Sequence, residues 1–196
     1  QEALDKLLFV PMTVSMSGGG NYELGTVLDS VTLSWSISKT IQSQLLTGAG
    51  AVQPALADRS AICVGPYSSN TSWTLTVTSA DGTEVKTASS AVAFYSRRYW
   101  GASASENASD VDIQGLSSEL SNSRLQTRTM DGQGKYLWFA WPVGFGAPTF
   151  IVNGLQNSAW EETIRSFTNT LGYSTSYRLY RSTYLQYGTG LQVLVQ

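Results

Sequence analysis

Strict alternation of apolar and polar residues marks the first half of the chain. In residues 31–38, the apolar side chains Val31, Leu33, Trp35 and Ile37 alternate with serine and threonine. A period of two is that of a β-strand with one buried face, and β-branched and aromatic residues favour it. Because Trp35 lies in the middle of the apolar face, we predict that it belongs to a hydrophobic core and does not bind a ligand.

Other segments of the first half share this strand pattern and are separated by residues that favour turns. The further predicted strands are 9–16, 41–46, 61–64, 72–78 and 88–95. The glycine-rich run 17–20 is expected to end the first strand, and Asp81-Gly82 is typical of a β-hairpin turn. About seven short strands with frequent turns indicate a β-sandwich of immunoglobulin or fibronectin type III shape, which we place at residues 9–96.

The most hydrophobic stretch of the chain is residues 135–142, which read K-Y-L-W-F-A-W-P. As a strand, it places Leu137, Phe139 and Trp141 on one face and the alternate residues, Trp138 among them, on the other. Both faces are apolar, and a strand that is buried on both sides lies in the middle of a sheet. We therefore predict that 135–142 is a central strand.

The rest of the second half contains weaker strand patterns and one helix signal. The predicted strands are 124–130, 149–153, 173–184 and 191–195, and 160–167 is either a strand or a short helix. Ser109 followed by Asp112 resembles a capping box, so a helix is expected from there to about Ser121, interrupted by Gly115. We predict that 97–196 forms a jelly-roll-like tip domain with one short helix. The fold class is then all-β, with two tandem β-sandwich-like domains.

The predicted boundary between the two domains, residues 94–101, contains no Pro/Gly linker. We expect one strand to leave the first domain and enter the second directly, with Tyr99 and Trp100 filling the joint. In a regular strand, Arg97 and Arg98 point to opposite faces and cannot form one cationic patch. Before the first domain, residues 1–8 have leucines at helical spacing, so they are either the end of an upstream stalk or an extended lead-in.

Composition excludes several function classes. Charged residues make up 13% of the chain, the net charge is −2, and no lysine/arginine cluster of nucleic-acid-binding type is present, so no DNA or RNA partner is expected. No apolar run reaches the roughly 20 residues of a membrane span, so we expect no membrane insertion. There is no histidine. The single cysteine, Cys63, lies in an apolar run and is expected to be a buried hydrophobe. We predict no metal and no cofactor.

Catalytic residues are not evident, and we expect that the protein is not an enzyme. Asp110 and Asp112 lie at the predicted helix start, where acidic residues stabilise the helix dipole. Glu161 and Glu162 follow Trp160 and could face a sugar, but adjacent strand residues point to opposite faces. They would therefore not converge as the paired carboxylates of a glycosidase do.

Ligand binding is better supported than catalysis in the second half. Residues 97–196 contain eight basic residues, seven of them arginine, together with most of the aromatic residues. Sugars stack on exposed aromatic rings, and loops carry function more often than strand centres do. The candidate ligand-binding residues are those near strand ends and turns: Trp141, Trp160, Arg181, Tyr184 and Tyr187. For each, the alternative is packing against a neighbouring domain or subunit.

A set of short segments appears in a fixed order along residues 21–195. The segments are Tyr22-Glu-Leu-Gly25, Val31-Thr-Leu-Ser-Trp-Ser36, Lys39-Thr40, Arg98-Tyr-Trp-Gly101, Leu116-Ser-Ser-Glu-Leu120, Gly134-Lys-Tyr-Leu-Trp-Phe-Ala-Trp-Pro142, Val152-Asn-Gly154, Thr168-Asn-Thr-Leu-Gly-Tyr173 and Tyr177-Arg-Leu-Tyr-Arg-Ser182. This ordered set resembles the C-terminal module of bacteriophage tail-associated virion proteins, which are long tail fibre or baseplate chains that end in an Ig-like domain and a β-rich tip.

The resemblance implies a structural or receptor-binding role in host attachment. The implied location is the virion, on the outward-facing part of the phage tail, and the implied assembly is a homotrimer. Its expected partners are other virion tail proteins and a host cell-surface glycan or protein. The family offers no catalytic motif. Two alternatives remain: a purely architectural spacer or trimerisation module, and a carbohydrate-binding module of a bacterial enzyme.

Overall fold

The computed structural model describes residues 10–196, so the possible stalk at residues 1–8 lies outside the described residues. Strands contain 59% of the residues and helices 4%, which confirms the predicted all-β class. The chain divides into two compact units: the first contains residues 26–94 with the segment before Glu23, and the second contains Glu23–Gly25 and Tyr95–Gln196. The boundary after Phe94 lies within the predicted boundary segment, 94–101.

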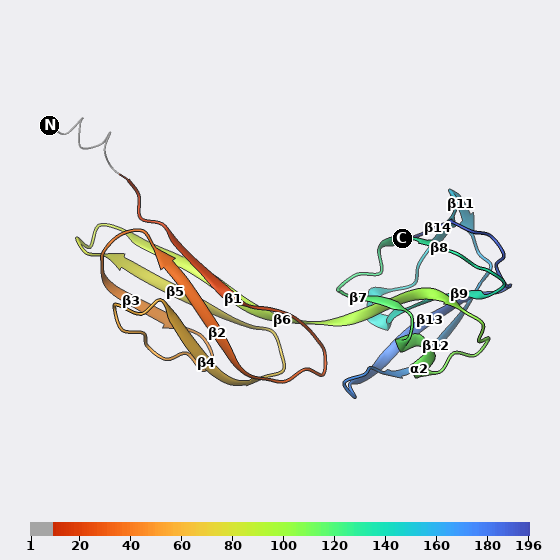
Figure 1. Cartoon of the computed structure of the whole chain (residues 1–196), viewed down its shortest axis with the longest axis horizontal. Helices are drawn as coiled ribbons and strands as arrows, with labels where there is room; N and C mark the ends of the chain where they lie inside the picture. The colour runs from red at the N-terminus through yellow and green to blue at the C-terminus, as the bar shows by residue number, and fades with distance from the viewer. Residues whose placement is uncertain (1–9) are drawn as a thin grey trace. The chain divides into compact units, whose positions relative to one another are not determined.

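The first unit is built from two antiparallel sheets of three strands. One sheet has the order β1-β2-β4 and the other the order β3-β5-β6, and β6 also neighbours β1. The strands are β1 (Val14–Glu23), β2 (Leu28–Ile37), β3 (Ile41–Thr47), β4 (Ser60–Tyr67), β5 (Thr71–Ser79) and β6 (Val85–Ser103). Because the chain crosses between the sheets after β2, after β3 and again after β4, the connections are those of an Ig-like sandwich (Figure 1).

The core of the first unit follows the alternating pattern. Trp35 is 6% exposed, as expected for a core residue, and its indole Nε1 donates to Oε1 of the buried Gln44 at 3.1 Å. Trp73, Leu75 and Val77 of β5 are fully buried. Cys63 is also buried, and this burial raises the pKa of its thiol. Removing such side chains from water is the main favourable contribution to folding.

The glycine-rich run does not end the first strand, which corrects the sequence-based prediction. Gly18 and Gly19 lie inside β1 and have positive φ angles of 124° and 76°. A Cβ atom at Gly19 would lie 2.1 Å from the carbonyl oxygen of Ala91, and one at Gly18 would lie 2.4 Å from that of Thr32. Glycine is therefore required here because the backbones of β6 and β2 approach β1 closely.

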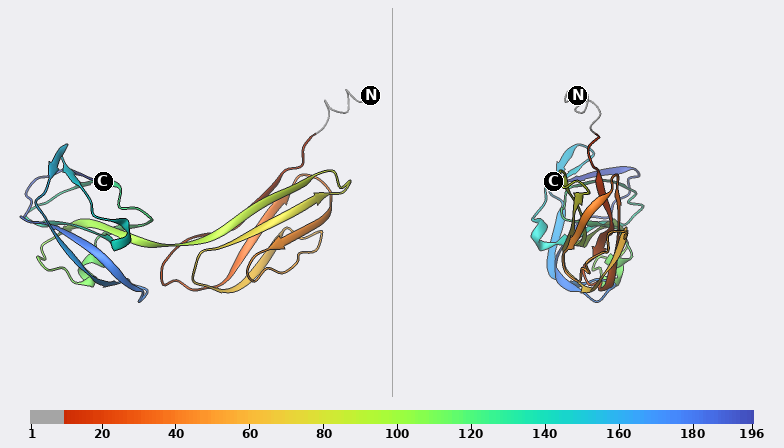
Figure 2. Two further views of the ribbon diagram at one scale, coloured as in Figure 1. Left: turned by 180° about the vertical axis from the view of Figure 1, so that it is seen from behind. Right: turned by 90° about the vertical axis from the view of Figure 1, so that its left-hand side faces the viewer.

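The second unit contains a five-stranded sheet and a four-stranded sheet, whose strands can be followed in Figures 1 and 2. The order of the first is β12-β13-β9-β6-β7, and that of the second is β11-β10-β14-β8. Its strands besides β6 are β7 (Ser117–Ser121), β8 (Gln126–Met130), β9 (Tyr136–Pro142), β10 (Phe150–Val152), β11 (Leu155–Asn157), β12 (Trp160–Thr168), β13 (Ser174–Ser182) and β14 (Leu191–Val195). Residues 160–167 thus form a strand. The Asn153-Gly154 turn joins β10 to β11.

Strand β9 is central and buried on both faces, as its sequence predicts. Leu137, Phe139 and Trp141 point into a core with Phe150 of β10 and Val193 of β14, between the two sheets. Trp138 and Ala140 point to the other face. There they pack in a second core with Tyr99, Ile113, Phe167, Tyr177 and Leu179. The five-stranded sheet therefore has an apolar layer on each side.

The helix is shorter than the sequence predicts. Helix α2 (Asp110–Gln114) begins with the predicted capping box, in which the Ser109 and Asp112 side chains bond each other's backbone N–H groups. It ends at Gly115, and the next residues form β7, which pairs with β6. Ile113 of the helix is fully buried, whereas Val111 is 74% exposed. Ile113 therefore provides the buried contact of this short helix.

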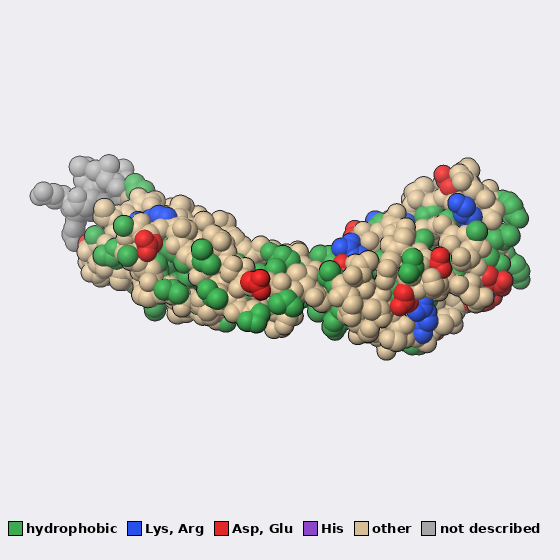
Figure 3. Space-filling view, turned by 60° about the horizontal axis from the view of Figure 1, so that its bottom comes forward, with side chains coloured by type: hydrophobic (Ala, Val, Ile, Leu, Met, Phe, Trp, Pro, Cys, Tyr) green, Lys and Arg blue, Asp and Glu red, His purple; other side chains and the backbone are tan. Residues whose placement is uncertain are grey.

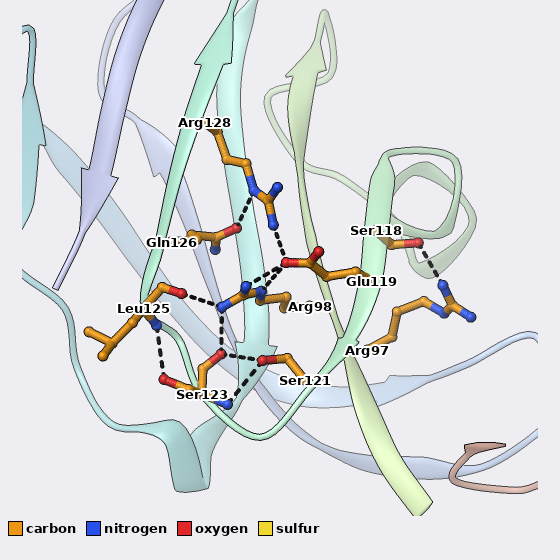
Figure 4. A network of polar contacts seen from close by, with 9 residues as sticks. All are labelled: Arg97, Arg98, Ser118, Glu119, Ser121, Ser123, Leu125, Gln126 and Arg128. Carbon is orange, nitrogen blue, oxygen red and sulfur yellow. Dashed lines mark hydrogen bonds and ion pairs between the residues drawn. The ribbon is translucent and has the colours of Figure 1, made fainter. Parts of the chain in front are cut away.

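One strand, β6, runs through the boundary between the units without a break in Figures 1 and 2, as predicted. Arg97 and Arg98 point to opposite faces of it (Figure 4). Arg97 binds Glu23 and Ser118, whereas Arg98 binds Glu119 and the carbonyl oxygens of Ser123 and Leu125. These contacts tie β6 to β7 and to the chain that follows β7.

Tyr99 and Trp100 do not fill a joint, contrary to the prediction. Tyr99 is 2% exposed and packs on Phe167 at a centroid distance of 5.3 Å, inside the second unit. Trp100 packs against the core on the opposite face, and the guanidinium of Arg128 lies 3.5 Å from the centroid of its ring. Both aromatic residues therefore stabilise the five-stranded sheet itself.

Candidate functional site

Strands β12 and β13 form the edge of the five-stranded sheet, and each face of this strand pair lines a pocket. In their antiparallel register, Glu161 lies opposite Arg181 and Glu162 lies opposite Tyr180. The two glutamates point to opposite faces, as the sequence predicts. Each therefore lines a different pocket, Glu161 on one side of the sheet and Glu162 on the other.

The pocket on the Glu162 side, which we name the Trp160 pocket, has a volume of about 330 Å³. It is lined by Ala147, Pro148, Thr149, Phe150, Gln156, Asn157, Ser158, Trp160, Glu162 and Tyr180. Trp160 is partly exposed and stacks on Phe150, with ring centroids 4.1 Å apart and an angle of 18° between the planes. This stacking holds the indole ring in place at the wall of the pocket.

A fixed carboxylate stands next to this ring. The Tyr180 hydroxyl donates to Oε1 of Glu162 at 2.6 Å, and Arg178 forms an ion pair with the same oxygen. The Tyr180 hydrogen bond and the charge of Arg178 lower the pKa of Glu162, although its partial burial opposes them. Burial in turn raises the pKa of Tyr180 to about 12, so this hydroxyl keeps its proton at neutral pH. Glu162 is therefore a charged acceptor held in one position.

The β10–β11 hairpin supplies amide groups to the same pocket. Its turn requires left-handed backbone at both central residues, with φ of 49° at Asn153 and 82° at Gly154, as the Asn-Gly pair favours. Gln156 follows on β11 with an exposed side chain. Asn157 accepts a hydrogen bond from the backbone N–H of Ala159 at 2.8 Å, which fixes its orientation.

The pocket on the Glu161 side, which we name the Arg181 pocket, has a volume of about 440 Å³ and a different chemistry. Arg181 is 7% exposed, and its guanidinium forms ion pairs with Glu106 at 2.9 Å and with Glu161 at 2.5 Å. The guanidinium also lies 4.6 Å from the centroid of the Tyr136 ring. Glycoside hydrolysis requires a carboxyl group that holds a proton. Here two carboxylates are both paired with one guanidinium, so the arrangement is an ion-pair cluster.

Tyr184 and Tyr187 lie in the loop 183–190 between β13 and β14, which we name the tyrosine loop. They are 70% and 74% exposed, the highest exposed fractions among the described tyrosines. Backbone hydrogen bonds between Gln186 and the turn before β9 anchor the loop, and the Thr183 N–H donates to the carbonyl of Ala159 at 2.9 Å. This last bond places the start of the loop beside Ala159, which directly precedes Trp160.

The exposed surface of the second unit carries no large patch of one charge in the view of Figure 3. Basic side chains lie next to acidic ones, and hydrophobic side chains gather at the right-hand end of this unit. Each arginine from Arg97 onward binds an acceptor of this chain: Arg97, Arg98, Arg128, Arg165, Arg178 and Arg181 bind carboxylates, and Arg124 binds two backbone carbonyls. The arginines of the second half thus bind acceptors within the chain itself.

The five candidate residues predicted from the sequence separate into three groups. Trp160 lines the Trp160 pocket, and Tyr184 and Tyr187 lie in the adjoining loop. Arg181 lies in the opposite pocket, bound to carboxylates of the chain. Trp141 is fully buried and donates its indole N–H to the Gly146 carbonyl at 3.1 Å. It offers no ring face to a ligand, so the expectation for Trp141 is corrected.

Sequence reasoning missed Glu162, Gln156 and Phe150 as parts of one pocket. The Asn153-Gly154 turn is a usable signal for Gln156, because it places that residue on the returning strand of a hairpin. No local pattern brings Phe150 next to Trp160. Their rings meet because the two sheets pack face to face, which depends on the whole topology of the second unit.

Within residues 10–196, no group of three or more His, Cys, Asp or Glu residues is placed to hold a metal ion. None of the described helices is long and apolar enough to cross a membrane. A scan against protein-family models gives no match for this chain, and a search of curated proteins gives none either.

Proposed function

We propose that this chain is a non-enzymatic module of a bacteriophage tail fibre or baseplate that attaches the virion to a glycan on the host surface. The Trp160 pocket is the observation that carries this proposal. A partly exposed indole ring stands beside a fixed carboxylate and an exposed amide, at the wall of a pocket of about 330 Å³. Apolar C–H faces of a sugar pack on such a ring, while its hydroxyl groups bond to carboxylates and amides.

The ordered sequence segments support the phage part of the proposal. They resemble those of tail-associated virion proteins, in which an Ig-like domain precedes a β-rich tip. The tyrosine loop supports the binding part, since it begins beside Ala159, next to Trp160, and carries two exposed tyrosine rings that a longer glycan could contact. Contacts with other tail proteins and assembly as a homotrimer belong to the same proposal.

An architectural role is the second candidate, and one observation favours it. The arginines of the second half are all engaged within the chain, as expected where polar side chains serve to hold strands together. In that case the first unit is a spacer and the second a contact between subunits. A carbohydrate-binding module of a bacterial enzyme would use the Trp160 pocket in the same way and would differ only in the chain to which it is joined.

Binding to whole host cells tests the proposal. The chain is labelled with a fluorophore and presented as multimers, because weak sugar sites gain from avidity. We expect Trp160→Ala to lower cell binding by at least about tenfold, the typical effect of truncating a central aromatic contact. The matched control is Tyr173→Ala, which removes a tyrosine of 40% exposure at the other end of the β12–β13 pair and should leave binding unchanged.

A second variant covers the chance that Trp160→Ala weakens the fold. Gln156→Ala changes an exposed side chain of the pocket and should lower binding without affecting thermal stability. Equal binding to cells before and after enzymatic removal of surface glycans would refute a glycan receptor. A monomer in sedimentation or light-scattering measurements would contradict the homotrimer.

A further inference from the structure

We infer that the Trp160 pocket selects an uncharged sugar and discriminates against sugars with an anionic group, such as uronates. This inference rests on the proposed function and specifies the class of sugar that the pocket receives. It follows from the charges at the pocket and from the way in which Glu162 is held.

The first observation is that the pocket lining contains one acidic residue, Glu162, and no lysine or arginine. The nearest guanidinium partner of Glu162 is Arg178, whose cation is already paired with that carboxylate. An anionic sugar group in the pocket would find no unpaired cation in the lining, and the charged group that it would approach there is the Glu162 carboxylate. Close like charges are unfavourable in a partly desolvated site.

The second observation is that the two oxygens of Glu162 are used differently. Both Tyr180 and Arg178 contact Oε1. Among the described residues, no donor contacts Oε2, and the Glu162 side chain is 38% exposed. The hydroxyl donor of Tyr180 is occupied by Glu162, so what remains on this wall is an acceptor. An acceptor binds the hydroxyl groups of a neutral sugar and offers nothing to a sugar carboxylate.

The third observation is the position of Trp160. Its ring stacks on Phe150 with centroids 4.1 Å apart. Glu162 lies two residues further along the same strand. A sugar that packs one face on the exposed part of the indole therefore has its ring hydroxyls within range of the carboxylate. The exposed amide of Gln156 stands on the facing hairpin and can both donate and accept.

A multivalent glycan array tests the inference. It carries glucose and galactose oligosaccharides, each beside its glucuronate or galacturonate counterpart. Multimers of the wild-type chain should bind at least one neutral sugar about tenfold or more above its uronate partner, a difference that moderate charge repulsion supplies. Glu162→Gln removes the charge and keeps the size, so the ratio should decrease severalfold. Glu161→Gln, the neighbouring change on the opposite face, should leave the ratio unchanged.

Wild-type preference for the uronates would overturn the inference, as would a ratio that Glu161→Gln changes and Glu162→Gln does not. Glycan-dependent binding to host cells, with no binding to any neutral sugar on the array, would also overturn it while leaving the proposed function standing. Loss of both cell binding and array binding would refute the proposed function itself. The two failures are therefore distinguishable.

Discussion

The two pockets beside the β12–β13 strand pair are built from the same kinds of side chain in different arrangements. Each has an aromatic residue and a glutamate that is paired with an arginine; that arginine lines the Arg181 pocket, whereas Arg178 lies outside the lining of the Trp160 pocket. In the Arg181 pocket, the arginine is 7% exposed and lies between two carboxylates. In the Trp160 pocket, a buried tyrosine and an arginine hold one oxygen of the carboxylate and leave the other without a donor from the described chain.

The comparison shows that residue types alone do not determine whether a pocket can bind a ligand. The role depends on whether the polar groups already form hydrogen bonds and ion pairs within the chain. In the Arg181 pocket both carboxylates are paired with the buried arginine, and Trp138 of the pocket lining is 5% exposed. In the Trp160 pocket a ring and an acceptor remain accessible. Four changes test this contrast, from the largest expected effect to the smallest.

The largest effect is expected from removing the aromatic layer behind the Trp160 pocket. Trp141 is fully buried and packs on Tyr180 at a centroid distance of 5.1 Å. Trp141→Ala should lower the free energy of unfolding by about 3–5 kcal/mol, because a large cavity forms in the core. Urea denaturation measures the loss. Trp141→Phe keeps a ring and should lose clearly less; equal losses would mean that packing does not explain the role of Trp141.

The next effect concerns the Arg181 pocket. Arg181→Met should lower the free energy of unfolding by about 1–3 kcal/mol, because it removes hydrogen bonds to charged groups while leaving Glu106 and Glu161 able to regain water. Those two side chains are 63% and 53% exposed. The folded variant should bind host cells as the wild type does. Loss of cell binding by a folded Arg181→Met chain would show that the Arg181 pocket takes part in binding, which contradicts this contrast.

A pH dependence is expected from Glu162. Its pKa in the folded chain lies below its usual 4.5, first because of the hydrogen bond from Tyr180. A carboxyl group with a lowered pKa stabilises the fold above its unfolded pKa, and this contribution is lost as the pH falls through the folded pKa. The difference in melting temperature between wild type and Glu162→Gln should therefore be larger at about pH 7 than at about pH 3. A difference that stays constant with pH would contradict this role.

The smallest effect is expected from Trp160→Phe. The indole Nε1 of Trp160 is buried and has no hydrogen-bond partner among the described residues. Removing it relieves an unsatisfied donor, which offsets the loss of ring area, so the free energy of unfolding should stay within about 1 kcal/mol of the wild-type value. Cell binding should fall far less than in Trp160→Ala, since an aromatic face remains. Equal loss of binding in both variants would show that stacking is not what the ring contributes.

Local patterns predicted most of the fold. Alternation of apolar and polar residues predicted the strands of the first unit and the place of Trp35 in the core. The two apolar faces of 135–142 predicted the central position of β9. Predictions were wrong where close approach of distant strands decided the outcome. Gly18 and Gly19 continue β1 because their backbone meets β6 and β2, and the residues after Gly115 form a strand because β6 offers them a partner.

The candidate site could be predicted only in part. Trp160 and the tyrosine loop follow from aromatic residues next to polar segments and turns. Trp141 looked equally suitable at the end of its strand, but the four-stranded sheet covers it. No sequence pattern near Trp141 predicts that this sheet packs there. The arginines favoured a ligand site in the second half, but the acids that they bind are spread from Glu23 to Glu162 in this same chain.

One measurement tests the central claim most directly. The indole N–H groups of Trp160 and Trp138 report on the two pockets in the NMR spectrum of the folded chain, because the first lines the Trp160 pocket and the second the Arg181 pocket. During titration with the neutral oligosaccharide that binds best on the array, we predict that the Trp160 signal shifts and saturates while the Trp138 signal stays in place. A shift of Trp138 with Trp160 unchanged would contradict the account.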